Sequence, residues 1–349
     1  MNTQLNDKVR PIRWQDTELL LLDQRYLPQQ QNWLRLNSAP AVARAIADLV
    51  VRGAPAIGIS AAWGLVLSLL QHRHVVAPEQ YKRIAEDIEI LAAARPTAAN
   101  LVWALERVSR PLQAGRDIDT VIDEAIGIAE QIQIDDVAAN YRMGELGASL
   151  IEPGSIVLTH CNAGSLATGG YGTALGVIRK AWTDGLIDAV YACETRPWLQ
   201  GARLTVWELQ QDGIPATLIT DSAAAWLLDQ QRVDWVITGA DRVASNGDVA
   251  NKIGTRNLAG LCQLGDTQMM VVAPLSTIDV HTATGAEIDI EVRSANELTE
   301  IGDWDINKEH IDVWNPVFDI TPADWIDALV TEQNIVRFPD NASINKLFR

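Results

Sequence analysis

The hydrophobic pattern of the chain changes near Ser155, and this change constrains the fold more than any other feature. Beyond it, short runs rich in Val, Ile, Ala and Thr alternate with stretches of helical periodicity. We expect strands over 155–161, 188–194, 215–220, 234–241 and 269–274, and helices over 173–184, 200–212, 222–231 and 255–264. Strands that alternate with helices favour a parallel sheet covered by helices on both faces. We therefore expect a doubly wound α/β domain over residues 146–349.

The chain before Ser155 lacks this alternation. Two short apolar runs, 11–14 and 19–22, predict a β-hairpin, and periodic stretches predict helices over 38–51, 61–70, 78–93, 97–108 and 118–150, the last as one helix or two. Residues 1–145 are therefore expected to form a mostly helical domain with a small β element. At the other end, the sequence TPAD favours a helix over 322–331, followed by a last strand over 334–338.

Charge limits the classes of partner. The 349 residues include 28 Lys and Arg against 45 Asp and Glu, a net charge of −17. Such a chain repels nucleic acid and anionic membrane surfaces, so we expect neither as a partner. If the substrate carries a phosphate, a few placed residues must supply the positive charge.

The cysteines and the apolar runs limit where in the cell the protein is expected to act. Three cysteines without a CxxC pair, Cys161, Cys193 and Cys262, fit neither a disulfide framework nor a cysteine zinc site, and we expect no metal. The first ten residues lack the apolar core of a signal peptide. The uncharged run 54–71 is interrupted by Pro and Gly, which favours a buried helix over a membrane span. A cytoplasmic protein is the expectation.

Polar residues that follow the expected strands are the candidates for chemistry, because ligands bind beyond the carboxyl ends of parallel strands. Cys161 ends one strand and precedes a glycine-rich turn, where a thiol can be activated; the alternative is a buried structural cysteine. Asp241 ends the apolar run DWVITGAD, a setting that makes a carboxyl a candidate acid; helix capping or pairing with Arg242 explains it equally well.

Two further patterns are weaker. The glycine-rich stretch 164–176 lacks the Lys of a phosphate-binding loop and the third glycine of a dinucleotide fingerprint, which argues against a nucleotide cofactor. Arg52, Arg95 and Lys252 each lie beside a turn where a cation can bind phosphate, although a surface or helix-terminal role is common for such residues.

Seven segments in order carry a resemblance to a known family: VVRGAPAIG (50–58), ARPTAANL (94–101), THCNAGSLATGG (159–170), ETRPWLQGARLT (194–205), TGADRVASNGDVANKIGT (238–255), VVAPLSTID (271–279) and NPVFDITPADWIDALVTE (315–332). Together they closely resemble the 5-methylthioribose-1-phosphate isomerases, which are related to the regulatory subunits of eukaryotic translation initiation factor 2B. The chain departs from that family at Cys193, where an acidic residue often stands.

The resemblance implies an aldose–ketose isomerisation in methionine salvage, from 5-methylthio-ribose 1-phosphate to 5-methylthio-ribulose 1-phosphate, without a cofactor. It implies a helical N-terminal domain, a Rossmann-like C-terminal domain and a cytoplasmic homodimer. The family's catalytic residues fall on Cys161 and Asp241, the latter as proton donor. Its substrate-binding positions fall on Arg52, Gly53, Ala54, Arg95, Gln200, Asn251 and Lys252.

Two alternatives stay open at this stage. The same fold serves non-catalytic regulatory subunits, since function depends on the site rather than on the fold. An isomerase of ribose 1,5-bisphosphate is chemically close, but it needs a second phosphate site in place of the methylthio pocket.

Overall fold

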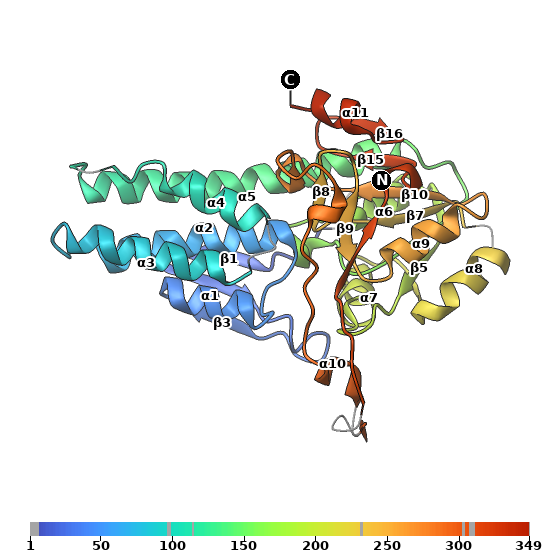
Figure 1. The fold of residues 1–349 in the computed structure, drawn as a ribbon, viewed down its shortest axis with the longest axis horizontal. Helices are drawn as coiled ribbons and strands as arrows, with labels where there is room; N and C mark the ends of the chain where they lie inside the picture. Colours follow the sequence, from blue (N-terminus) through green and yellow to red (C-terminus); the bar gives the residue numbers. More distant parts are fainter. Residues whose placement is uncertain are drawn as a thin grey trace.

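The computed structural model describes residues 7–95, 99–113, 115–230, 233–301, 304–306 and 311–348. Its N-terminal part begins with an antiparallel sheet of three strands, β1 (Ile12–Gln15), β2 (Glu18–Leu22) and β3 (Trp33–Leu36). Helices follow, namely α1 (Ala39–Ala47), α2 (Ala54–Gln71), α3 (Glu79–Ala93), α4 (Ala99–Ser109) and α5 (Ile118–Ala148). They lie side by side at the left of Figure 1.

Helix α2 forms the centre of this part. It is apolar on nearly every side and long enough to cross a membrane, yet 83% of its residues are buried within the protein. Pro55 stands in its first turn, where a missing N–H costs no hydrogen bond. Trp63 of α2 stacks on Trp14 of β1 with ring centroids 4.4 Å apart. The expectation of a buried helix is confirmed, and the helix begins earlier than its periodicity indicated.

The C-terminal part is built on a seven-stranded sheet of order β16-β15-β10-β7-β4-β5-β6. Its strands are β4 (Ser155–Thr159), β5 (Ile187–Cys193), β6 (Thr217–Ile219), β7 (Trp235–Thr238), β10 (Gln268–Val272), β15 (Ala328–Val330) and β16 (Ile335–Arg337). All pairs are parallel except β15–β16. The parallel strands follow the order 3-2-1-4-5-6 of a doubly wound sheet, so the α/β expectation is confirmed.

Side chains alternate between two apolar layers on the sheet. Val157, Ile237 and Val272 pack on the face covered by α5, α6 (Ala174–Thr183) and α7 (Val206–Gln211). Leu158 and Val236 pack on the opposite face, against α8 (Ala224–Gln230), α9 (Thr255–Cys262) and α11 (Asn341–Lys346). Because both faces are buried, the sequences of the central strands β4, β7 and β10 are mostly apolar.

A small sheet of order β11-β8-β9-β14 lies beside the large one. Its strands are β11 (Ile278–Asp279), β8 (Arg242–Ala244), β9 (Val249–Lys252) and β14 (Phe318–Thr321). The chain between β11 and β14 leaves the body of the molecule as an arm that carries α10 (Asn296–Thr299), β12 (Glu300–Ile301) and β13 (Trp304–Asp305) at the bottom of Figure 1. This sheet was not predicted from the sequence.

Several expected elements differ from the structure. The helix over 322–331 is wrong: a 3-10 turn, Ala323–Trp325, leads into strand β15. Residues 328–330 are apolar and pair with β10 and β16, and this tertiary pairing overrides the helix-like start. Strand β3 was not expected, and α5 is one helix. The start of the helix expected over 97–108 falls partly on residues 96–98, outside the described residues. The domain division at 145/146 lies within α5 and stays a prediction.

Helix α5 contacts α6 at glycines, which provides a matched stability test. A Cβ at Gly147 would lie 2.4 Å from Cγ2 of Val177, whereas a Cβ at the exposed Gly127 of the same helix would meet nothing within 4 Å. We expect Gly147→Ala to lower the free energy of unfolding by about 1–3 kcal/mol through overpacking. Gly127→Ala should raise it by about 0.4–1 kcal/mol. Urea unfolding measures both, and equal effects would contradict the packing argument.

Candidate functional site

The carboxyl ends of β4 and β7 meet where the helical part of the chain touches the sheet. Cys161 and Asp241 follow these two neighbouring strands and line the same cavity of about 40 Å³. The helical part contributes the opposite wall. Of the residues singled out from the sequence, those lining the cavity are Arg52, Gly53, Ala54, Cys161, Asp241 and Asn251. A larger groove of about 970 Å³ adjoins it and shares Pro55 and Pro274.

The backbone at Cys161 is held in an unusual conformation. Its φ is +64°, in the left-handed region, which costs a non-glycine residue roughly 1–3 kcal/mol and is found mainly at functional sites. The Cys161 N–H donates to Oγ1 of Thr195 at 2.9 Å, and its carbonyl accepts from Oγ1 of Thr205 at 2.6 Å. The neighbouring His160 donates instead to the Ile253 carbonyl, so no Cys–His pair forms with Cys161.

A buried carboxylate organises the turn that follows Cys161. Glu208 of α7 is fully buried and accepts from Nδ2 of Asn162 and from the backbone N–H groups of Ser165 and Leu166. Its charge is balanced by Arg179 of α6, with Nη2 2.9 Å from Oε2. Arg179 also binds Asp212 at 2.7 Å. The glycine-rich turn is therefore held by an ion network, and Gly164 permits the close approach, since a Cβ there would lie 2.4 Å from Oε2 of Glu208.

Burial and nearby cations act in opposite directions on the pKa of the Asp241 carboxyl. It is partly buried at the end of β7, and its backbone N–H donates to the Ala250 carbonyl of β9. Burial raises the pKa of its carboxyl, and the charges of Lys252 and Arg95 oppose that effect. Its neighbour Arg242 forms an ion pair with Asp279.

Arg52 joins the helical part of the chain to this turn. Its Nη1 and Nη2 donate to the Asn162 carbonyl at 2.8 and 2.7 Å, and Nη2 also donates to the Asn162 side chain. Gly53 has a φ of +94°, and a Cβ there would lie 2.6 Å from the backbone of Ala167. Only glycine permits this approach. The guanidinium that the sequence suggested for phosphate thus contacts the turn that follows Cys161.

Two more cations surround Asp241. Arg95 lines a second cavity of about 20 Å³ together with Ala54 and Asp241, and its Nη2 lies 3.2 Å from Oε2 of Glu291. Lys252 is buried with its Nζ 4.3 Å from the Phe318 ring centroid. Burial lowers the pKa of Lys252 to about 8, while negative charge on Cys161 and Asp241 raises it. Lys252 lines neither cavity.

The amide candidates differ in position. Asn251 lines the larger of the two cavities and donates from Nδ2 to Oγ1 of Thr255 at 2.9 Å. Gln200 lines neither cavity; it is buried at the start of a π-helical turn, Gly201–Thr205, and its Oε1 has no hydrogen-bond partner among the described residues. π-helical turns of this kind occur often at functional sites.

Sequence reasoning missed the residues that position the site. Glu208, Arg179, Thr195 and Thr205 contact the turn at Cys161 but have no spacing that relates them to it. The available signal was chemical. Arg179 and Glu208 are ionisable residues within the core-facing helices α6 and α7, and Asp212 follows α7 directly. Such residues are seldom buried unless they are paired.

Comparison with known proteins gives a consistent result. The model of the initiation factor 2 subunit family matches residues 50–337. A methylthioribose-1-phosphate isomerase of Thioalkalivibrio sulfidiphilus is 52% identical over 344 residues, which cover 98% of each chain.

Two solved structures resemble the chain over nearly its whole length. The 5-methylthioribose 1-phosphate isomerase of Pyrococcus horikoshii has a TM-score of 0.91 and 38% identity, covering 100% of this chain and 98% of that one. The delta subunit of translation initiation factor eIF-2B from A. fulgidus has a TM-score of 0.85 and 39% identity, covering 97% and 100%.

Breaking the buried ion network should destabilise the protein far more than breaking an exposed pair. We expect Glu208→Gln to lower the free energy of unfolding by about 3–5 kcal/mol, because buried Arg179 keeps only Asp212 as a partner charge and an amide nitrogen faces a group that donated to the carboxylate. Asp184→Asn removes the partly exposed Lys180–Asp184 pair of the same region and should cost less than about 0.5 kcal/mol. Denaturant unfolding of both variants measures the contrast, and similar losses would show that the network is not what holds the turn.

Proposed function

The chain belongs to the initiation factor 2 subunit family, and we infer that it catalyses the conversion of 5-methylthioribose 1-phosphate to 5-methylthioribulose 1-phosphate, an aldose–ketose isomerisation of methionine salvage. The observation that carries this function is the convergence of Cys161 and Asp241 on one cavity that also contains Arg52 and Asn251. A fold used only for binding has no need of a thiol and an acid facing the same space.

The substrate dictates what the site must do. Its anomeric oxygen carries phosphate, so the furanose ring cannot open by the ordinary hemiacetal route. The ring oxygen must gain a proton as its bond to C1 breaks, and hydrogen must then pass from C2 to C1. One group must deliver a proton and another must act at C2.

We assign these roles to Asp241 and Cys161. Asp241, whose pKa is raised by burial, is suited to protonate the ring oxygen. Cys161 faces the same cavity and acts at C2, and Lys252 interacts electrostatically with both groups. If hydrogen moves as a proton, the Cys161 thiolate takes it from C2 and returns it to C1, while the Asp241 carboxylate takes the C2 hydroxyl proton. Both groups then return to their starting states.

Transfer as a proton or as a hydride can be separated by isotope. Turnover in deuterated water places deuterium at C1 of the ketose if the proton on Cys161 exchanges with solvent. Absence of deuterium at C1 favours either hydride transfer from C2 to C1 or a proton shielded from solvent.

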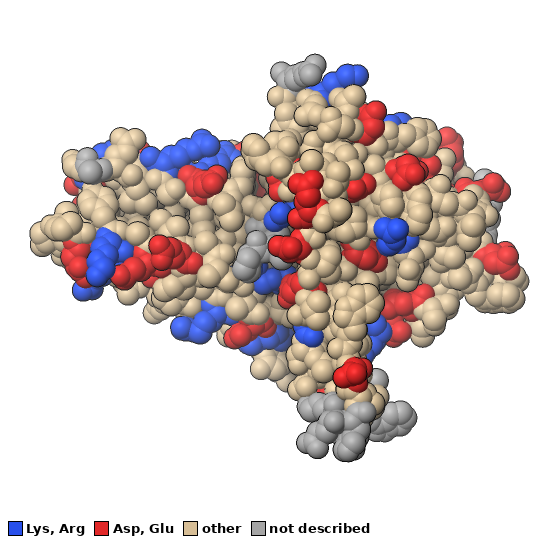
Figure 2. Space-filling model, viewed as in Figure 1, with Lys and Arg blue, Asp and Glu red and all other residues tan. Residues whose placement is uncertain are grey.

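Phosphate binding falls to a local group of cations within an acidic protein. Arg52, Arg95 and Lys252, with the backbone N–H groups of Gly53 and Ala54, are the donors that we assign to it, and Gln200 and Asn251 to the sugar hydroxyls. On the face of the molecule seen in Figure 2, the Lys and Arg side chains of the described residues form separate small groups among acidic side chains. This distribution fits a small phosphorylated substrate better than nucleic acid or a membrane. We also propose a cytoplasmic homodimer.

The two cavities are too small for a pentose phosphate. Their volumes are about 40 and 20 Å³, and a single water molecule already needs about 10–15 Å³ of cavity volume. The Arg52–Asn162 contact closes the wall between the helical part and the sheet. We propose that the two parts separate for the substrate to enter, with the adjoining groove at Pro55 and Pro274 as the route.

An assay of the purified protein decides between an isomerase and a regulatory subunit. The similarity to the eIF-2B delta subunit is the observation that favours a regulatory subunit. Turnover of methylthioribose 1-phosphate supports the proposal. Turnover of ribose 1,5-bisphosphate alone would move the assignment to that sugar, and turnover of neither would favour the regulatory role.

The catalytic assignment predicts large rate losses at two positions. Cys161→Ser and Asp241→Asn should each lower kcat by at least about 100-fold, with a modest change in KM, since general acid–base groups contribute roughly 10²–10⁴-fold. The control is Cys262→Ser, a buried cysteine of α9 remote from the cavity lining, which should keep kcat within a few-fold. Near-normal turnover of Cys161→Ser would make the thiol a packing residue.

The phosphate assignment predicts a loss of affinity at Arg95. Arg95→Ala should raise KM about 10- to 150-fold, because a charge-assisted hydrogen bond contributes about 1.5–3 kcal/mol. Glu291→Gln removes the ion pair but leaves the guanidinium in place, so its KM should not rise. An equal rise in both variants would mean that the ion pair, rather than the cation, is what the site requires.

A further inference from the structure

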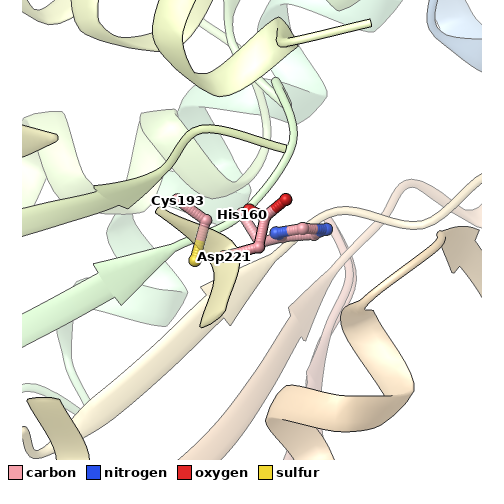
Figure 3. A group of neighbouring side chains, drawn as sticks. All are labelled: His160, Cys193 and Asp221. Atoms are coloured by element: carbon pink, nitrogen blue, oxygen red, sulfur yellow. The ribbon is translucent and has the colours of Figure 1, made fainter. Parts of the chain in front are cut away.

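A second cluster of chemically active side chains lies beside the proposed catalytic cavity. His160 follows β4, Cys193 ends β5 and Asp221 follows β6, so the three stand at the carboxyl ends of three neighbouring parallel strands. One ligand atom from each lies within 4.8 Å of the others. Figure 3 shows the three side chains close together beyond the ends of these strands. None of them lines the cavity that contains Cys161.

The imidazole of His160 is prepared for a ligand. Its Nε2 lies 2.9 Å from the Ile253 carbonyl, and because a carbonyl can only accept, Nε2 carries the proton. Nδ1 then has a free lone pair. It is buried, and it has no hydrogen-bond partner among the described residues. His160 itself is 2% exposed, so this nitrogen is an unsatisfied acceptor inside the protein.

Asp221 is oriented in the same way as carboxylates that bind metals. Its two oxygens accept the backbone N–H groups of Thr195 and Arg196 at 2.8 and 2.7 Å, which fixes the carboxyl while leaving further lone pairs. It is only partly buried, whereas His160 and Cys193 are buried. The open side of the cluster is therefore at Asp221.

We propose that Nδ1 of His160, Sγ of Cys193 and a carboxylate oxygen of Asp221 bind one divalent ion of the zinc class, with water as the fourth ligand. Nitrogen, thiolate and carboxylate are the ligands that zinc takes in proteins. A neutral imidazole with one thiolate and one carboxylate balances the two charges of the ion. Ligand bonds of about 2.0–2.3 Å require ligand atoms roughly 3.5 Å apart, so the side chains must draw in by about 1 Å.

Such an ion would fix the turn that carries Cys161. Asp221 binds the Thr195 N–H, and Thr195 Oγ1 accepts the Cys161 N–H. The ion would also tie together the ends of β4, β5 and β6. The three ligands are far apart along the chain and only the sheet brings them together, so the spacing of residues in the sequence indicates no metal site.

Cobalt binding tests the site. The purified protein is treated with a chelator, freed of it and titrated with Co²⁺, whose thiolate complexes absorb strongly in the near ultraviolet. We expect one ion per chain with a thiolate band, and displacement by Zn²⁺. Cys193→Ser and Cys193→Ala should abolish the band and weaken Co²⁺ binding by more than about 100-fold. Losing a residue that only hydrogen-bonds a metal ligand typically weakens metal binding by about 10- to 100-fold. Cys262→Ser should retain both.

The outcomes are distinct. Absence of a thiolate band in the unaltered protein would overturn the proposal. So would a band that persists in both Cys193 variants, because Cys161 or Cys262 would then be the ligand. The melting temperature without metal shows that each variant is folded, and only proteins that bind should gain stability on adding Zn²⁺.

Discussion

The ion network centred on Glu208 is the constraint on which the site depends. A carboxylate with no solvent exposure costs several kcal/mol unless charge and hydrogen bonds satisfy it, and here Arg179 and three N–H donors do so. Two of those donors are backbone groups of the turn after Cys161. Because the turn must keep these bonds, Cys161 is held at a positive φ that it would not adopt alone. The strained backbone of Cys161 is thus stabilised by the interactions of Arg179 on α6 and Glu208 on α7.

The second constraint joins the two parts of the molecule. Arg52 binds the Asn162 carbonyl, Gln24 donates to the Leu166 carbonyl at 2.7 Å, and Gly53 packs on Ala167. Each contact joins the helical part to the turn after Cys161, whose backbone N–H groups also donate to Glu208. A displacement of the helical part would therefore shift the turn that follows Cys161. This coupling explains how a substrate that widens the cavity could also alter the position of the thiol.

The sheet could be predicted from the sequence because burial on both faces leaves an apolar run for every central strand, and the convergence of Cys161 and Asp241 followed from the rule for parallel strand ends. What the sequence could not show depends on contacts between distant segments. β15 is a strand because β10 and β16 flank it, although its start resembles a helix. Glu208 acts on residues more than forty positions away, and Arg52 was expected to face phosphate rather than a carbonyl.

The change of backbone conformation just after β4 allows one sheet edge to hold two kinds of chemistry. His160 and Cys161 are adjacent, yet His160 contacts Ile253 after β9 while Cys161 faces the cavity toward the helical part. Parallel strands place the polar residues that follow them at one edge. The left-handed backbone at Cys161 then turns the chain, so that the two side chains have separate surroundings. The cavity and the His160–Cys193–Asp221 cluster are therefore neighbours through the backbone but separate environments. Thr195, bonded to both Asp221 and Cys161, is the connection between them.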